Sequence, residues 1–428
     1  MISNNSPNFR WVILLMLLGV QLVSSMVAFG WGALAPSLKE LMSLNNMQVG
    51  IISSTFFIAS GLSAFPGGIF VDRYGVKKSL LFSLWLVGFP LLFLGLVYSR
   101  HVVFLAMVAI SGFGYGMSSP VGTKGLFEWF DVKTRGTAFG IRQASVPVGG
   151  AAAGVLLVYV CQKIGSFATF RVLGLMIVVM AMLAFYLYRT PERDGSIPVE
   201  KNHAKNNRLP KTGFRGFFKN KALLVIFAIV GVMGLQQGVI VTFFLVFVNE
   251  GLGYSLSAAG FLLATLMISG AVGRVFWGIV SDSLFNGGRK PVLIIISALI
   301  TLSVVMLACW SRAWPQSLFF LVVIVIGLST LGWNAVALVL VVEVSEGGKA
   351  GSSSGFAMGL GWVGMVVGTL SFGALTDYSG YYHAWMFLVA FSLLSLTLCL
   401  LLPGSKKLQN SPSRIGNKLR LGAKKNAN

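Results

Sequence analysis

The sequence predicts an all-α membrane protein with twelve transmembrane helices. Of its 428 residues, 56% are hydrophobic and only 11% are charged, whereas soluble globular domains carry about 25% charged residues. Long uncharged apolar runs recur along the chain, many of them near or above the ~18 residues that cross a ~30 Å hydrocarbon core. Membrane barrel strands need only about ten residues, so these runs predict helices as the spanning elements.

Twelve apolar runs predict these helices, and short polar segments separate most of them. The runs are 11–36, 47–71, 79–98, 102–122, 136–160, 168–188, 222–249, 258–281, 291–311, 316–342, 352–376 and 382–402. The first run follows Arg10, is longer than the core of a signal peptide and lacks a small-residue cleavage pattern. We therefore expect it to remain as the first membrane helix.

One long polar segment divides the twelve runs into two sets of six. This division predicts an N-terminal six-helix bundle (1–188), a basic cytoplasmic linker (189–221), a C-terminal six-helix bundle (222–403) and a basic cytoplasmic tail (404–428). The tail contains no acidic residue, and we expect it to be disordered.

The two predicted bundles repeat each other. Glu128 ends the fourth run and Glu343 ends the tenth, 215 positions later. Arg135 and Ala350, which precede the fifth and eleventh runs, are also 215 positions apart, and a glycine follows each. Parallel repeats of this kind predict two bundles that are related by a pseudo-two-fold axis along the membrane normal.

The basic surplus of the chain follows the predicted topology. The net charge is +21, from 33 Lys and Arg against 12 Asp and Glu. If the N-terminus is cytoplasmic, the loops and tail on that side hold most of these cations, and the opposite side holds only Lys39, Arg100, Lys163 and Arg312. This is the positive-inside pattern, so we expect a protein of the cell membrane with both termini on the cytoplasmic side. We also expect the basic loops to contact anionic lipids, and we expect no nucleic-acid partner. We also expect a monomer.

A glycine-rich charged loop (68–78) separates the second and third runs. It reads G-x-x-x-D-R-x-G-x-[KR]-[KR] around Asp72, and a related loop (278–290) around Asp282 follows the eighth run. The loop resembles the signature loop of the major facilitator superfamily of secondary transporters, and its recurrence in both halves strengthens the resemblance. The resemblance implies twelve helices in two six-helix bundles around a central cavity that opens to each side of the membrane in turn.

The resemblance also implies that the charged groups of these loops control the gate, by latching the outward-facing state. The implied gating residues are Asp72, Arg73, Glu128, Arg135, Asp282 and Glu343. We expect Arg73, Glu128 and Arg135 to lie beside Asp72, although simple anchoring of the loop is the alternative. Lys124 is expected to pair with Glu128, four residues later on the same helix.

Arg274 is the leading candidate for a substrate ligand. It lies eight residues before Asp282, which is ~12 Å along a helix. A buried cation faces a cavity or a partner, and the sequence has no carboxylate in the middle of a run, so an anionic substrate is the expected partner. The pattern Gly273-Arg274-x-x-x-Gly278-x-x-x-Asp282 resembles the same span of nitrate/nitrite porters and oxalate–formate antiporters, where this arginine binds the anion. Ala64 stands where the nitrate porters carry a second arginine, which disfavours nitrate.

Arg142 is the second candidate, six residues into the fifth run. It could bind the anion, or it could extend to the cytoplasmic headgroups or pair with a gate residue. The run 142–150 resembles a motif of a poorly characterised branch of bacterial facilitators. It only partly resembles the motif of drug/proton antiporters, because the spacing differs, and Val108 stands where those proteins have an arginine.

Polar side chains within the runs supply the rest of the predicted site, because the first, fourth, seventh and tenth spans line the cavity in the family that the chain resembles. The expected substrate-binding residues are Gln21, Tyr115, Gln143, Gln236 and Asn334, together with the two arginines. For each of them, a hydrogen bond between helices is the alternative. Gln237 and Trp333 also lie within runs.

These features predict a secondary transporter that moves a small organic anion, a carboxylate or sulfonate, by alternating access. A drug or neutral-solute efflux or uniport carrier of the same superfamily is the alternative, and a membrane enzyme or a non-transporting sensor is the alternative from a different class. We expect no enzyme activity, metal or cofactor, because no catalytic or phosphate-binding constellation occurs. Coupling to a proton or a sodium ion stays open, since the expected relay carboxylate is missing from the runs.

Overall fold

A computed structural model describes residues 9–130, 132–190, 220–311, 314–345 and 350–403. Within these ranges the chain is helical and contains no strand. Most of the predicted linker and the whole predicted tail lie outside the described residues, as does the side chain of Arg135.

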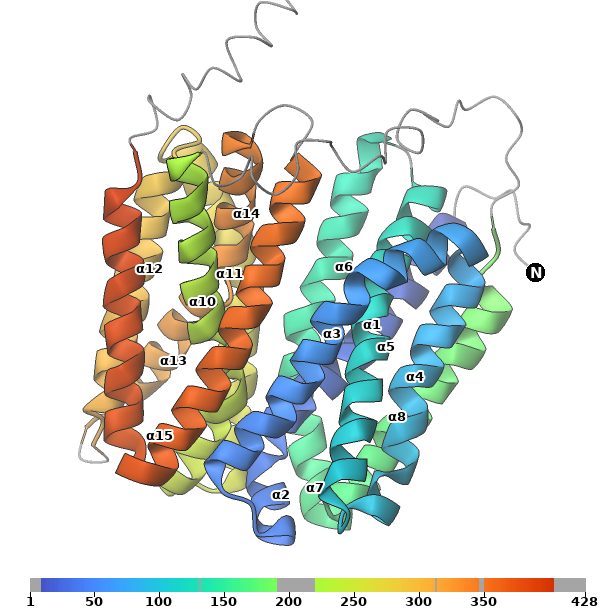
Figure 1. Ribbon diagram of the computed structural model, residues 1–428, viewed down its shortest axis with the longest axis horizontal. Helices are drawn as coiled ribbons and strands as arrows, with labels where there is room; N and C mark the ends of the chain where they lie inside the picture. The colour runs from blue at the N-terminus through green and yellow to red at the C-terminus, as the bar shows by residue number, and fades with distance from the viewer. Residues whose placement is uncertain (1–8, 131, 191–219, 312–313, 346–349, 404–428) are drawn as a thin grey trace, which may run out of the picture.

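The helices form two groups along the chain (Figure 1). The first group contains α1 (Phe9–Ala33), α2 (Ala35–Met42), α3 (Asn46–Tyr74), α4 (Val76–Val97), α5 (His101–Trp129), α6 (Val132–Ala152), the π-helix η1 (Ala153–Leu157), α7 (Val158–Ile164) and α8 (Ser166–Leu187). The second contains α10 (Lys221–Val246), the π-helix η3 (Phe247–Gly251), α11 (Leu256–Ser283), α12 (Arg289–Ala308), α13 (Gln316–Thr330), α14 (Trp333–Val344) and α15 (Ala350–Leu401). We call these groups the N-half and the C-half.

The prediction of twelve membrane helices is confirmed. Ten stretches of the described residues are long and apolar enough to cross a membrane, but two of them, Asn46–Val97 and Ser353–Leu401, have 52 and 49 residues. Each of the two is divided by a glycine, Gly75 (φ 78°, ψ 168°) or Gly380 (φ 81°, ψ 172°). Only glycine adopts this conformation readily. Each long stretch is therefore two helices, which makes twelve crossings.

The repeat seen in the sequence is also present in the backbone. Gly165 separates α7 from α8 with φ 82° and ψ 167°, nearly the same angles as at Gly380, 215 positions later. Polar caps fix the starts of three long helices: Asn45 caps α3, Asn220 caps α10 and Ser255 caps α11. Each cap satisfies backbone N–H groups of the first turn, which have no partner within the helix.

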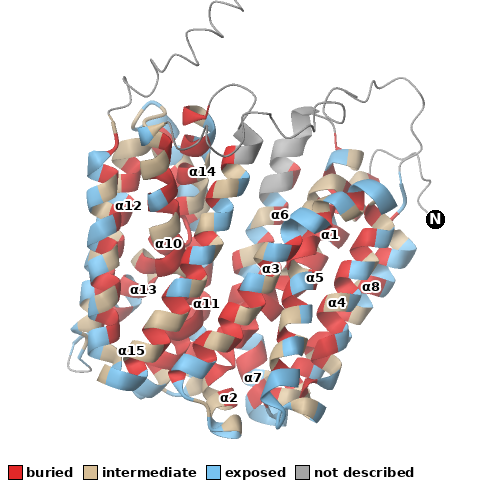
Figure 2. Cartoon of the chain, viewed as in Figure 1, coloured by how far each residue is buried: buried red, intermediate tan, exposed pale blue. Residues whose placement is uncertain are grey.

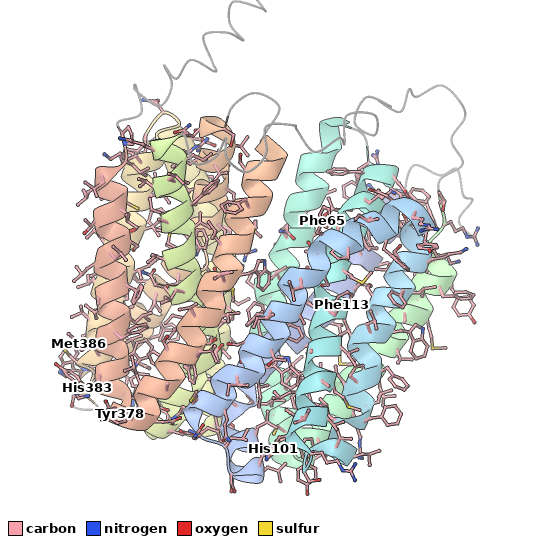
Figure 3. The ribbon with its side chains drawn as sticks, viewed as in Figure 1. Phe65, His101, Phe113, Tyr378, His383 and Met386 are labelled. Carbon is pink, nitrogen blue, oxygen red and sulfur yellow. The ribbon has the colours of Figure 1, made fainter. Side chains whose placement is uncertain are left out.

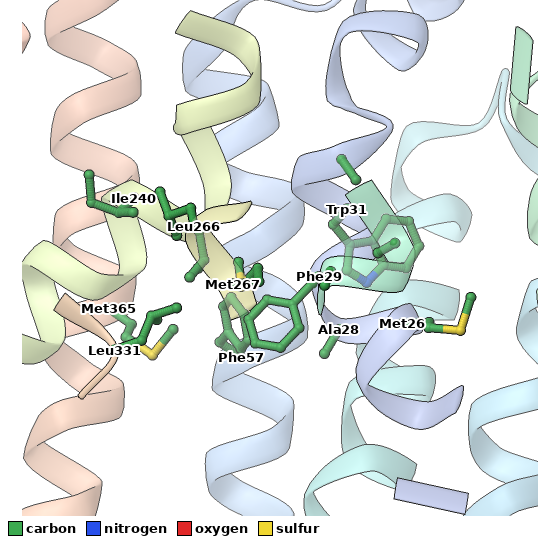
Figure 4. Packing of buried hydrophobic residues seen from close by; sticks show 14 of the residues in the cluster. Met26, Ala28, Phe29, Trp31, Phe57, Ile240, Leu266, Met267, Leu331 and Met365 are labelled. Carbon is green, nitrogen blue, oxygen red and sulfur yellow. The ribbon is translucent and has the colours of Figure 1, made fainter. Parts of the chain in front are cut away.

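The halves meet along two pairs of helices. On one side α3 packs against α15, and on the other α11 packs against α6 and η1, while α1 and α10 meet between them. The repeat relates these two contacts, because α11 follows α3 by six membrane helices and the first part of α15 follows α6 by six. Buried residues face the spaces between helices, and exposed residues face outward (Figure 2). Figure 4 shows this buried contact, where Met267 of the C-half and Phe29 of the N-half both lie against Gly150.

The two ends of the molecule differ. We call the end with Asp72 and Asp282 the loop face, and the end with α2 and Gly380 the far face; His101 and Tyr378 in Figure 3 mark the far face. At the loop face, every ion pair between described residues joins two residues of the same half. At the far face, Lys39 of the N-half pairs with Glu250 of the C-half. The halves are therefore tied together by charge at the far face.

Candidate functional site

Arg142 is packed inside the N-half, with only 2% of its surface exposed. Its Nη2 atom donates to Oε1 of Gln21 on α1 (2.6 Å) and to the carbonyl of Ser118 on α5 (3.3 Å). Among the described residues, its Nε atom has no hydrogen-bond partner. A Cβ atom at Gly122 would lie 2.5 Å from Nη2, so the glycine leaves the space that the guanidinium occupies. The side chain thus lies among α1, α5 and α6 and not at a helix end.

Arg274 lies on α11 and is half-buried. Its Nε atom donates to the carbonyl of Leu331 (3.3 Å), in the break between α13 and α14, and its Nη1 atom donates to the carbonyl of Gln143 (3.4 Å) on α6. The second bond crosses from the C-half to the N-half. Gly273 lets α11 approach α13, because a Cβ atom there would lie 2.2 Å from the carbonyl oxygen of Leu328. Gly273 therefore allows α11 to pack closely on α13, whereas the side chain of Arg274 lies between the halves.

Tyr115 of α5 lies near both arginines and near Ser25. Its ring packs against that of Phe56, with 5.5 Å between the centroids. The structure thus gathers cationic and neutral polar groups of α1, α5, α6 and α11 at one place. In the part of the chain that the structure describes, no carboxylate pairs with either arginine.

The polar residues of the C-half form a second group. Oε1 of Gln237 on α10 accepts hydrogen bonds from Nε1 of Trp333 (3.1 Å) and Nδ2 of Asn334 (3.2 Å) on α14. Gln236, which the sequence favoured, is fully buried and donates instead to Ser395 on α15 (3.3 Å). Adjacent helix residues point about 100° apart, and the packing of α10 decides which of the two faces α14. The sequence contained no signal for that choice.

The loop-face carboxylates of the N-half find partners other than those expected. Lys124 pairs with Asp72 (2.8 Å) and also donates to the carbonyl of Val71 (3.0 Å), so the expected pairing of Lys124 with Glu128 was wrong. Glu128 accepts a hydrogen bond from the hydroxyl of Tyr188 (2.8 Å). Burial, together with the charge of Glu128, raises the pKa of Tyr188, which keeps this hydroxyl protonated as the donor.

Arg73, another gate candidate of the N-half, is exposed and lies over the ring of Tyr74, 5.4 Å from its centroid. In the C-half, Arg289 joins both predicted carboxylates. It pairs with Asp282 (2.6 Å) and with Glu343 (3.4 Å). Among the described side chains, the loop face thus carries one three-membered cluster in the C-half and two separate pairs in the N-half. None of the described residues forms a group of three or more His, Cys, Asp or Glu that could hold a metal ion.

Twelve membrane-crossing helices in two repeated halves are the architecture of a membrane transporter, and the family assignment agrees with it. The chain belongs to the Major Facilitator Superfamily, whose sequence model matches residues 17–287 and, in a second match, 234–425. The resemblance seen in the signature loops is thereby confirmed, and the chain is a multi-pass membrane protein.

Curated relatives and solved structures agree with this assignment. The chain is 25% identical over 395 residues to a probable hexose phosphate transport protein of Chlamydia pneumoniae, covering 86% of this chain and 85% of the relative. It is 22% identical over 434 residues to a probable galactarate/D-glucarate transporter of Bacillus subtilis, covering 95% and 94%. The fold matches a bacterial homolog of the human lysosomal transporter Spinster with a TM-score of 0.77, at 14% identity, covering 95% of this chain and 100% of that one.

Proposed function

We propose that this transporter moves a small organic anion, a carboxylate or a sulfonate, across the cell membrane by alternating access. The observation that carries the proposal is the pair of guanidinium groups, Arg142 inside the N-half and Arg274 reaching from the C-half to the N-half, that no described carboxylate neutralises. A buried uncompensated cation is costly, and an anion that binds between the halves would remove that cost. The two curated relatives are named for transport of anionic substrates, which supports the same class.

The two arginines have different roles in this proposal. Arg274 donates two long hydrogen bonds, of 3.3 and 3.4 Å, and the acceptor of each is a backbone carbonyl. An anion that replaces them gains a charge-assisted bond, so Arg274 is the principal ligand. Arg142 is held more tightly, at 2.6 Å from Gln21, and it supplies positive charge next to the bound anion. Gln21 and Tyr115 then orient the substrate.

The contacts of the C-half refine the remaining roles. Gln237 joins Trp333 and Asn334 of α14, so in this proposal Gln237 is the polar ligand of α10, while Gln236 supports the packing of α10 on α15. The loop-face pairs around Asp72 and Asp282 serve as the gate of the cytoplasmic side, with both chain termini on that side. This orientation rests on the positive-inside pattern of the loops.

The test is thermal stabilisation of the purified protein by a panel of ligands. A ligand that binds only the folded state raises the apparent stability by mass action. The panel contains carboxylates and sulfonates with one or two anionic groups, inorganic anions, sugars and cationic drugs. We expect organic anions to stabilise the protein, and Arg274→Ala to abolish the shift. Arg171→Ala is the matched control, since Arg171 is an exposed arginine of α8, and it should keep the shift. Stabilisation by cations or neutral solutes alone would favour a drug or neutral-solute carrier.

A further inference from the structure

The first turn of α3 is capped by a residue of the other half. Backbone N–H groups at the start of a helix have no partner within the helix. In α3, the side chain of Asn45 accepts from the N–H of Gln48. The N–H groups of Asn46 and Met47 donate to Oδ1 and Oδ2 of Asp377, at 2.8 and 2.7 Å. Asp377 belongs to α15, so the C-half completes the cap of an N-half helix.

The amide of Asn46 ties this cap to a second charged contact. Its Nδ2 atom donates to Oδ1 of Asp377 (2.8 Å), and its Oδ1 atom accepts from Nζ of Lys39 on α2 (2.8 Å). Lys39 also pairs with Glu250 of η3, and the hydroxyl of Tyr381 donates to the same carboxylate (3.4 Å). The network therefore crosses between the halves twice, through Asp377 and through Glu250. A carboxylate at a helix N-terminus also interacts favourably with the helix dipole.

The repeat places a weaker contact at the equivalent position on the other side of the molecule. Gln162 lies 215 positions before Asp377, and Ser257 lies 210 positions after Met47. These two residues also meet across the halves, where the hydroxyl of Ser257 donates to Oε1 of Gln162 (2.9 Å). A single neutral hydrogen bond thus stands where the α3 side has three bonds to a carboxylate. The far face is held asymmetrically, and its charged side is at α3 and α15.

The backbones of α3 and α15 also pack closely beside this cap. A Cβ atom at Gly373 would lie 2.5 Å from the carbonyl oxygen of Asn46, and one at Gly50 would lie 2.7 Å from that of Thr369. The helices α3 and α15 are therefore in close backbone contact directly beside the cap. Because the three bonds to Asp377 join the C-half to the start of α3 in the N-half, separation of the halves at the far face must break all three.

We propose that Asp377 is the gating residue of the far face, where its carboxylate latches the C-half to the first turn of α3 and holds this side of the transporter closed. Lys39 and Glu250 reinforce the latch through Asn46. The inference rests on alternating access in the proposed function but not on the substrate being an anion. Opening of the far face then requires water to replace Asp377 as the acceptor for the start of α3.

The experiment measures closure of the far face without substrate. Spin labels are placed on cysteines introduced at Leu41 of α2 and Tyr382 of α15, which are exposed by 49% and 55%, after the three native cysteines are replaced. Electron paramagnetic resonance then gives the distance distribution of the full-length protein in lipid nanodiscs. Asp377→Asn keeps the shape of the side chain but loses its charge and one acceptor oxygen. We expect Asp377→Asn to raise the ratio of far-open to far-closed molecules about tenfold or more, because hydrogen bonds to charged groups are stronger than those between neutral groups.

Two comparisons decide the outcome. Gln162→Ala removes the neutral counterpart and should shift the ratio by about threefold or less. Asp377→Glu keeps the charge and should lie between the wild type and Asp377→Asn. An Asp377→Asn protein with the wild-type distance distribution, or one that shifts no more than Gln162→Ala, would overturn the proposal. Because no ligand is present, loss of the anion hypothesis would leave this measurement unaffected.

Discussion

The two surfaces on which the halves meet are related by the repeat but carry different chemistry. The helices α6 and α11 carry the two interior arginines: Arg142 of α6 lies within the N-half, and Arg274 of α11 reaches across the contact to the carbonyl of Gln143. At the equivalent positions of α3 and α15, Ala64 stands 210 positions before Arg274, and Ala357 stands 215 positions after Arg142. The cations of one surface are therefore replaced by methyl groups on the other.

The α3/α15 surface instead holds groups that clamp the halves together. Phe57 lies against Trp362 with 5.5 Å between ring centroids, and the hydroxyl groups of Ser54 and Thr369 are 2.7 Å apart. The Asp377 cap continues this line to the far face. The repeat thus gives two equivalent contact surfaces; in the function proposed above, α6/α11 is the binding surface and α3/α15 is the clamping surface.

The largest expected effect is that of Arg274→Ala on transport. Removal of this guanidinium takes away a charge-assisted pair with the anion, worth about 3 kcal/mol or about a hundredfold in transport efficiency. Uptake into proteoliposomes, measured for the anion that gives the strongest thermal stabilisation, checks this prediction. Arg171→Ala should transport at the wild-type rate. If Arg274→Ala transports normally while folded, the arginine is structural and α6/α11 is not the binding surface.

A smaller effect is expected from Gly122→Ala, which displaces Arg142 without removing it. The new Cβ atom would lie 2.5–2.7 Å from three guanidinium atoms, so the flexible end of Arg142 must move away from Gln21. We expect anion affinity to fall about tenfold with little change in melting temperature. Gly359→Ala is the matched control, because no atom lies within 4 Å of a Cβ at that position. Equal anion affinities of the two variants, measured by calorimetry, would show that Arg142 does not contribute to anion binding.

A still smaller effect is expected at the loop face, where the halves differ again. Among the described carboxylates, Arg289 pairs with two, Asp282 and Glu343, whereas Lys124 pairs with one, Asp72. Arg289→Ala leaves two carboxylates near each other without a cation, so it should slow transport more than Lys124→Ala does. Because exposed pairs contribute only about 0–1 kcal/mol, we expect roughly fivefold and twofold reductions in the rate of uptake. The reverse order would show that the N-half pair is the more important part of the gate.

Much of the fold could be predicted from the sequence because it depends on local patterns. Apolar runs of sufficient length define the helices, and the glycine of the signature loop falls where φ is positive, at Gly75. The interior position of Arg274 follows from the same patterns, since it lies well inside an apolar run, whereas the sequence left open whether Arg142, nearer the end of its run, extends to the headgroups.

The contacts of the site could not be predicted, because they join residues far apart in the chain. The choice between Gln236 and Gln237 depends on how α10 is rotated in the bundle, which packing sets. Lys124 pairs with Asp72, 52 residues away, and not with its helical neighbour. Asp377 caps a helix 331 residues away, so no local pattern at Asn46 announces it. The sequence contained these residues but not their distances.

The smallest effect tests whether the middle of the α3/α15 surface only clamps. Ser54→Ala removes the hydroxyl that meets Thr369, but Thr369 still donates to the carbonyls of Met365 and Val366 on its own helix. Hydrogen bonds between membrane helices average about 0.6 kcal/mol, or about threefold in an equilibrium. We therefore expect the spin-label distances of Ser54→Ala to show at most a threefold shift toward far-open molecules, with unchanged anion affinity. A tenfold loss of affinity in this variant would place substrate contacts on α3 as well and would end the division of labour between the two surfaces.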